Sequence, residues 1–226
     1  MPEKPDHIDH RKRLRDRFAN GGGEALADYE LLELCLFQAI PHQDTKPIAK
    51  ALLKRFSTYA GVLHATPDEL RGVKGMGDAA VIALKTVVEA ATRLAREEVL
   101  NQPVLSSWDK LIDYLRIGMG QKKAEQFRIL FLDTKNKLIA DELHQDGTVN
   151  HTPVYPREVV KRALELSAVA IIMVHNHPSG DPAPSRADID MTQQMRDVGA
   201  PIGVTLHDHI IISRSDYSSF KAVGLI

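Results

Sequence analysis

Residues 175–188 read His-Asn-His-Pro-Ser-Gly-Asp-Pro-Ala-Pro-Ser-Arg-Ala-Asp, in which His175, His177, Ser185 and Asp188 place two imidazoles, a hydroxyl and a carboxylate close together in the chain. His175 and His177 follow an apolar run over 168–174 that is typical of a short buried strand. Because side chains on a strand repeat with period two, both rings project to the same side. Asp188, at the start of the next expected helix, offers a third ligand. Three protein ligands leave one position of a tetrahedral Zn²⁺ open, as in catalytic sites.

The same stretch also has a structural interpretation. Ser185 and Asp188 fit a capping box, in which the serine caps a helix and the acid bonds back to the backbone of the cap. A His-x-His pair alone is weak support for a metal site. Judged in isolation, residues 175–188 leave the metal site and the helix cap as alternatives.

The complete spacing is more specific. One residue separates the two histidines, seven separate His177 from Ser185, and two separate Ser185 from Asp188. This order resembles the signature of the JAMM (MPN-plus) metalloproteases, and residues 175–185 are most similar to the RadC family within that group. The resemblance extends to 127–136 and 207–209. It implies a mixed α/β domain that hydrolyses a peptide, isopeptide or related amide bond, and it carries an association with DNA repair.

The resemblance also assigns roles to two further residues. Glu125, directly before an expected strand, corresponds to the general base that passes a proton from water to the leaving amine. Zinc lowers the pKa of a bound water toward about 7, which makes this proton available. Ser185 corresponds to the donor that stabilises the oxyanion. Spacing alone leaves Glu142 and Glu158 as competitors for the base.

The other histidines give no clear metal signal. His207 and His209 could orient a ligand ring, although residues in an expected turn are more often structural. No partner at metal-ligand spacing is visible for the remaining ones considered, namely His42, His64, His144 and His151.

Composition excludes several classes of protein. The 226 residues contain 29 Lys and Arg against 30 Asp and Glu, so net charge gives no reason for binding nucleic acid or an anionic membrane. Cys35 is the single cysteine, which excludes an internal disulfide and a multi-thiolate zinc cluster. No signal peptide and no run of ~18 apolar residues is visible, so we expect a cytoplasmic protein without a membrane partner. The basic run over 10–17 is typical of a solvated arm, with a DNA contact as the alternative.

The first hundred residues read as helices, over 28–40, over 46–56 and from Thr66 onward. Gly75 and Gly77 then precede a helix that extends to about residue 98. This segment resembles a helix-hairpin-helix, whose bare backbone amides can approach a phosphate. It could equally be a tight link between packed helices. Since Asp78 places a negative charge at the turn, we expect at most a weak, nonspecific DNA contact.

A polar segment over 97–106 is expected to link a helical domain over 1–100 to a second domain over 104–226. The second domain alternates helices and strands, so the fold class is α+β. The expected helices cover 107–118, 156–167 and 185–198, and the expected strands cover 126–133, 137–144 and 168–174. We also expect a hairpin in which 204–206 pairs with 210–213 around residues 207–209.

These observations lead to one main hypothesis and one rival. The main hypothesis is a zinc metallopeptidase of JAMM type that acts on an unknown protein or peptide substrate. The rival is a DNA-associated repair accessory protein whose zinc site is structural or inactive. The intact set of ligands favours the enzyme.

Overall fold

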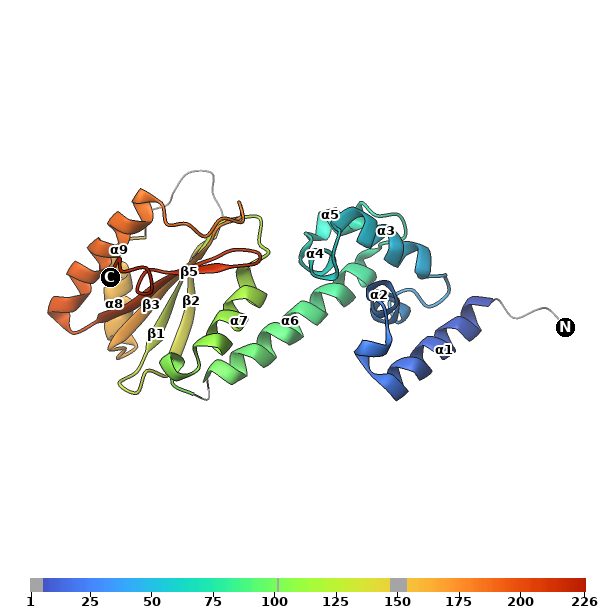
Figure 1. Ribbon diagram of the computed structural model, residues 1–226, viewed down its shortest axis with the longest axis horizontal. Coiled ribbons are helices and arrows are strands. Elements are labelled where there is room, and N and C mark those ends of the chain that lie inside the picture. The colour runs from blue at the N-terminus through green and yellow to red at the C-terminus, as the bar shows by residue number, and fades with distance from the viewer. Residues whose placement is uncertain (1–5, 101, 147–153) are drawn as a thin grey trace. The chain divides into compact units, whose positions relative to one another are not determined.

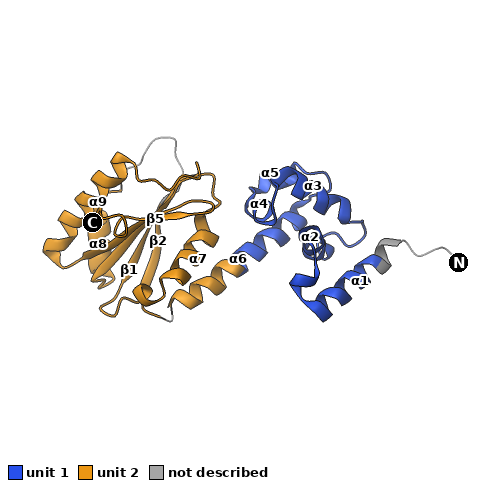
Figure 2. Ribbon diagram, viewed as in Figure 1, with its two compact units in different colours: residues 1–90 blue, residues 91–226 orange. Residues whose placement is uncertain are grey.

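The computed structural model describes residues 6–100, 102–146 and 154–226, and it contains two compact units, Met1–Ala90 and Ala91–Ile226 (Figure 2). The division falls within helix α6 (Asp78–Leu100). The first unit is helical and the second combines helices with a five-stranded sheet, so the predicted α+β class is confirmed (Figure 1). The segment 97–106, predicted as a linker, includes the end of α6, which continues to Leu100, and the buried Val104.

The helices of the first unit surround one apolar core. They are α1 (Asp6–Gly21), α2 (Asp28–Phe37), α3 (Lys46–Phe56), α4 (Tyr59–His64), α5 (Pro67–Arg71) and the start of α6, with a 3₁₀ turn at Gly23–Ala25. Their starts follow local chemistry: at α5, Thr66 and Glu69 form a reciprocal capping box and Pro67 occupies the first turn. Leu32, Leu52 and Leu84 are fully buried in the shared core.

The basic run near the N-terminus is part of helix α1 and not an arm, and its predicted exposure to solvent holds for Lys12, Arg13 and Arg15 but not for Arg11. Arg11 is buried, and its guanidinium donates to three backbone carbonyls, one at the last residue of α2 (Phe37) and two in the segment after it (Ile40 and Gln43). Arg17 forms a two-pronged ion pair with Glu30. Two of the basic groups therefore hold α1 against the rest of the unit.

The glycine turn between α5 and α6 is closely packed. Gly75 has a φ of 94°, and a Cβ there would lie 2.7 Å from Ile48, so this position requires glycine. Met76 is buried in the core. The Asp78 carboxylate accepts a hydrogen bond from Arg71 Nε at 2.8 Å. These contacts fit the interpretation as a tight link between helices, and a DNA contact stays a prediction.

The second unit is built on a five-stranded sheet in the order β2-β1-β3-β4-β5. The strands are β1 (Gln126–Leu132), β2 (Leu138–Asp146), β3 (Ala170–Asn176), β4 (Thr205–Ile212) and β5 (Tyr217–Ser219). Only the β3–β4 pair is parallel among the described strands. The helices are α7 (Trp108–Met119), α8 (Pro156–Glu165) and α9 (Arg186–Gly199), with 3₁₀ turns at Val104–Ser106 and Ala200–Ile202.

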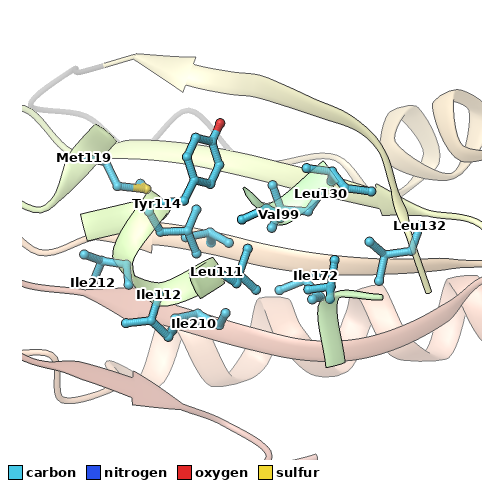
Figure 3. Close-up of a cluster of buried hydrophobic side chains, with 14 of the residues drawn as sticks. Val99, Leu111, Ile112, Tyr114, Met119, Leu130, Leu132, Ile172, Ile210 and Ile212 are labelled. Atoms are coloured by element: carbon cyan, nitrogen blue, oxygen red, sulfur yellow. The ribbon is translucent and has the colours of Figure 1, made fainter. Parts of the chain in front are cut away.

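Both faces of the sheet are covered, which explains the apolar runs in β1 and β3. Leu130 and Ile172 point toward α7, where they join a core that includes Leu111 (Figure 3). Their neighbours Ile129 and Ile171 belong to a separate core with residues of α8 and α9. Because the side chains alternate, the odd-numbered residues of β3 face α8 and α9.

The hairpin predicted around residues 207–209 was wrong. β4 runs unbroken from Thr205 to Ile212 and lies parallel to β3, with a register shift between Ile171 and Ile172. The polar residues in its middle indicated a turn, yet each finds a partner within the fold. Asp208, for example, accepts hydrogen bonds from the Ser219 hydroxyl and the Lys221 backbone N–H. No described helix has the length and apolar character needed to cross a membrane.

Candidate metal centre

Three potential ligands meet at the end of β3. His175 lies on β3, His177 follows the strand directly, and Asp188 lies in the first turn of α9. Helix α9 connects β3 to the parallel strand β4, so the N-terminus of α9 lies near the carboxyl end of β3. One ligand atom from each of the three residues lies within 4.8 Å of the other two.

The distances between the potential ligand atoms fit a tetrahedrally coordinated metal ion. His175 Nε2 lies 2.9 Å from His177 Nε2 and 3.4 Å from Asp188 Oδ1, and His177 Nε2 lies 3.8 Å from Asp188 Oδ2. Zinc bonds of 2.0–2.1 Å imply ligand separations of about 3.3 Å, inside this range. Burial lowers the pKa of His175 to about 4, so its ring is neutral at neutral pH and offers the lone pair that a metal requires. The group could therefore hold a metal ion.

The backbone fixes the orientation of His177. Its Nδ1 lies 2.8 Å from the carbonyl oxygen of Asp181. A carbonyl oxygen only accepts, so Nδ1 carries a proton and Nε2 is the nitrogen that a metal ion could bind. This is the nitrogen that faces His175 and Asp188.

The predicted capping box is also present, and it is compatible with a metal site. Asp188 Oδ2 accepts from the Ser185 backbone N–H at 2.8 Å and from the Ser185 hydroxyl at 2.6 Å. The Asp188 N–H donates in return to Ser185 Oγ at 3.2 Å. Oδ1 remains turned toward His175 Nε2. The two interpretations of this stretch are therefore complementary, since one oxygen serves the cap and the other faces the histidines.

Glu125 is exposed, and the segment that contains it is hydrogen-bonded to the side chain of Asn176. The amide of Asn176 donates to the carbonyls of Lys122 and Ala124 at 3.3 and 3.2 Å. Its oxygen accepts from the backbone N–H of Gln126 at 2.8 Å. Asn176 lies between the two histidines in sequence, so it joins the ligand strand to the residues on either side of Glu125. The only sign of this role in the sequence is the position of an amide side chain within the His-x-His motif.

The two competing glutamates are engaged elsewhere. Glu142 lies on the edge strand β2 and accepts hydrogen bonds from Arg162 at 2.7 to 3.0 Å, which lower the pKa of its carboxyl. Glu158 pairs with Arg157 at 3.2 Å in the first turn of α8. The residues that flank Glu125, Ala124 and Gln126, are hydrogen-bonded to Asn176, which lies between the two histidines. Its catalytic role stays a prediction.

His209 is closer to the centre than its sequence context indicated. It is fully buried on β4, and its Nε2 lies 2.8 Å from Nδ1 of His175. His207 instead contacts Asn136 Oδ1 at 2.7 Å. Within the described ranges, the group of His175, His177 and Asp188 contains none of the other histidines considered above, and His151 lies outside those ranges.

Comparisons with known proteins cover most of the chain. A family model for the RadC-like JAB domain matches residues 105–225, and one for the UPF0758 N-terminal region matches residues 6–82. A UPF0758 protein of Rhodobacter capsulatus is 58% identical over 213 residues, which is 94% of this chain and the whole relative. A UPF0758 protein of Ruegeria pomeroyi is 55% identical over 223 residues, 98% of this chain and again the whole relative.

The family match and the geometry agree. The JAB domain has a hydrolase-like fold, and its match spans the sheet, α9 and the three residues that could hold a metal ion. The resemblance to RadC proteins noted in the sequence is confirmed. The chain belongs to the UPF0758 family of proteins with a RadC-like JAB domain.

Proposed function

We propose that the chain is a zinc-dependent hydrolase that cleaves a peptide, isopeptide or related amide bond. The observation that carries the proposal is the convergence of His175, His177 and Asp188 beside the segment of Glu125. Two imidazoles and one carboxylate form a donor set typical of catalytic zinc. In this proposal residues 104–226 form the hydrolase domain and residues 1–100 form a helical accessory domain.

In this proposal a metal ion and two side chains share the steps of amide hydrolysis. When bound, zinc would act as a Lewis acid that lowers the pKa of a water molecule and polarises the carbonyl of the substrate. The Glu125 carboxylate takes the proton from the attacking water and delivers it to the nitrogen of the leaving amine. The Ser185 hydroxyl, after turning away from Asp188 Oδ2, donates a hydrogen bond to the carbonyl oxygen as negative charge develops there.

Metal analysis combined with an activity screen tests the proposal. Protein purified without chelator should contain about one zinc per chain. It should cleave members of a peptide or isopeptide library, lose this activity with a chelator, and regain it with zinc. The double substitution of His175 and His177 by Gln should abolish both zinc binding and cleavage activity. His207→Gln is the matched control, because this histidine contacts Asn136 and should not affect zinc.

Two results would contradict the proposal. One is protein without metal after chelator-free purification. The other is unchanged metal content in the double variant.

A further inference from the structure

A chain of buried hydrogen bonds leads from the ring of His175 into α9. His175 Nδ1 contacts His209 Nε2 at 2.8 Å, and His209 Nδ1 contacts Thr192 Oγ1 at 2.6 Å. Thr192 Oγ1 lies 2.5 Å from the backbone carbonyl oxygen of Asp188. His175, His209 and Thr192 are almost completely buried, so water does not compete for these groups. The chain starts at one expected ligand and ends at the backbone of another.

The direction of each hydrogen bond in this chain follows from the bond between Thr192 and the Asp188 carbonyl. The Asp188 carbonyl can only accept, so the Thr192 hydroxyl donates its single hydrogen there. Thr192 Oγ1 must then accept from His209, which places a proton on His209 Nδ1. His209 is fully buried and stacks on Phe220 with ring centroids 4.5 Å apart, surroundings that favour a neutral ring.

A neutral His209 that carries its proton on Nδ1 has an acceptor at Nε2. His175 Nδ1 must therefore donate, and the lone pair of His175 is left on Nε2. This atom lies 2.9 Å from His177 Nε2 and 3.4 Å from Asp188 Oδ1. The chain of hydrogen bonds thus fixes the tautomer in which His175 can bind a metal ion.

We propose that His209 is a positioning residue for the metal ligand His175, and that Thr192 orients His209 for this task. The inference rests on the metal site of the proposed function. Histidine ligands usually donate their second N–H to a carboxylate, a backbone carbonyl or water. A neutral imidazole in that place adds no negative charge, so a zinc ion held by His175 would be a stronger Lewis acid than one whose ligand donates to a carboxylate.

Zinc affinity of the metal-stripped full-length protein tests the inference. Competition with a chromophoric chelator should show that Thr192→Val binds zinc about tenfold more weakly and His209→Phe about 10- to 100-fold more weakly. Thr192→Ser keeps the hydroxyl and should restore affinity to within about twofold, by the same reasoning. His207→Phe removes the neighbouring histidine of β4 and should leave affinity unchanged, because His207 contacts Asn136.

Nitrogen NMR of the metal-free protein gives a readout that does not depend on metal binding. Two-bond proton–nitrogen correlations at neutral pH should show both His175 and His209 with the proton on Nδ1. In Thr192→Val, His209 should lose this fixed tautomer while the dispersion of the remaining spectrum reports an intact fold. If His209→Phe does not fold, the Thr192→Val and Thr192→Ser pair carries the test.

The outcomes separate the two proposals. Equal zinc affinity in the wild type, Thr192→Val and a folded His209→Phe would overturn this inference while the metal site stands. His175 with its proton on Nε2 would also overturn it. A wild type that binds no metal would overturn both proposals. Weakened affinity in the variants, in a protein that hydrolyses no amide bond, would support this inference and count against the proposed function.

Discussion

The side-chain oxygen of Asn176 accepts a hydrogen bond from the backbone N–H of Gln126 at 2.8 Å, and both residues are buried. This bond joins β3, which carries His175, to the first residue of β1, which follows Glu125. Together with the two bonds that Asn176 donates to the preceding carbonyls, it sets where the segment of Glu125 lies relative to the centre.

Asn176→Asp keeps the shape of the side chain and the acceptor for Gln126, but it loses both donors. We expect zinc content to stay near one per chain while turnover falls about tenfold, the equivalent of roughly one hydrogen bond. Amide hydrogen exchange over residues 122–126 should accelerate. Asn136→Asp, at another amide that contacts a histidine, is the control and should change neither quantity. Normal turnover and exchange in Asn176→Asp would show that the segment is held by other contacts.

Glu125→Gln should fold and retain zinc but lose activity by about 10²–10⁴-fold, because the amide cannot accept the proton of water. Glu142→Gln is the matched control. Its carboxylate is held by Arg162, so its removal should change stability slightly and leave turnover intact. Steady-state kinetics and metal analysis on the same preparations check both statements. An active Glu125→Gln beside an inactive, zinc-loaded Glu142→Gln or Glu158→Gln would reassign the base.

Substitutions of Ser185 separate helix capping from catalysis. Glycine at an N-cap costs only a few tenths of a kcal/mol, whereas alanine costs about 1 kcal/mol. Ser185→Gly should therefore unfold close to wild type in urea and still lose about 10²–10³-fold in kcat through the missing oxyanion donor. Ser185→Thr retains a hydroxyl and should recover part of the rate. Near-normal kcat in Ser185→Gly would limit Ser185 to the capping box.

The stability of the first unit should depend on pH through Glu30. Hydrogen bonds from Arg17 lower the pKa of this carboxyl below its ordinary 4.5. The ionised form is therefore favoured in the folded state, so its contribution is present above about pH 4.5 and is lost as the pH falls through the lowered pKa. Glu30→Gln should lower the urea midpoint at pH 7, and the difference from wild type should shrink below pH 4.5. A difference that persists unchanged in acid would exclude this cause.

DNA binding by the first unit should be weak and independent of sequence. Filter binding of duplex DNA at about 50 and 200 mM salt should show low affinity that falls further with salt. Asp78→Asn should strengthen binding a few-fold, because it removes a negative charge at the start of α6. Asp68→Asn also releases Arg71 but lies outside the glycine turn, so it serves as the control. Tight, selective binding that survives high salt would instead favour the accessory-protein hypothesis.

The elements with local signals were predictable. Thr66, Pro67 and Glu69 gave the start of α5 from adjacent residues alone, and the apolar run before His175 gave β3. The proximity of His175, His177 and Asp188 followed from their spacing, since the strand and the helix cap each act over a few residues. The fold class followed from the alternation of expected helices and strands after residue 104, and the family followed from the motif over 175–188 together with the similar segments at 127–136 and 207–209.

Other features depend on contacts between distant residues. Arg11 looked solvated because its partners are backbone carbonyls 26 to 32 residues away. The polar triplet in β4 looked like a turn, because the groups that satisfy it lie on α9, on β5 and in the loop after β1. A hydrogen bond between His175 and His209 spans 34 residues, and no local pattern predicts it.

The arrangement of β3, α9 and β4 also orders events during synthesis. A chain that has emerged only as far as residue 200 already carries every expected ligand, yet β4 and its buried His209 are still missing. Until β4 pairs in parallel with β3, His209 is not in place to accept a hydrogen bond from Nδ1 of His175. In the proposed site, tight metal binding would then require that β4 has already paired with β3. Metal binding would therefore depend on the completion of this part of the fold.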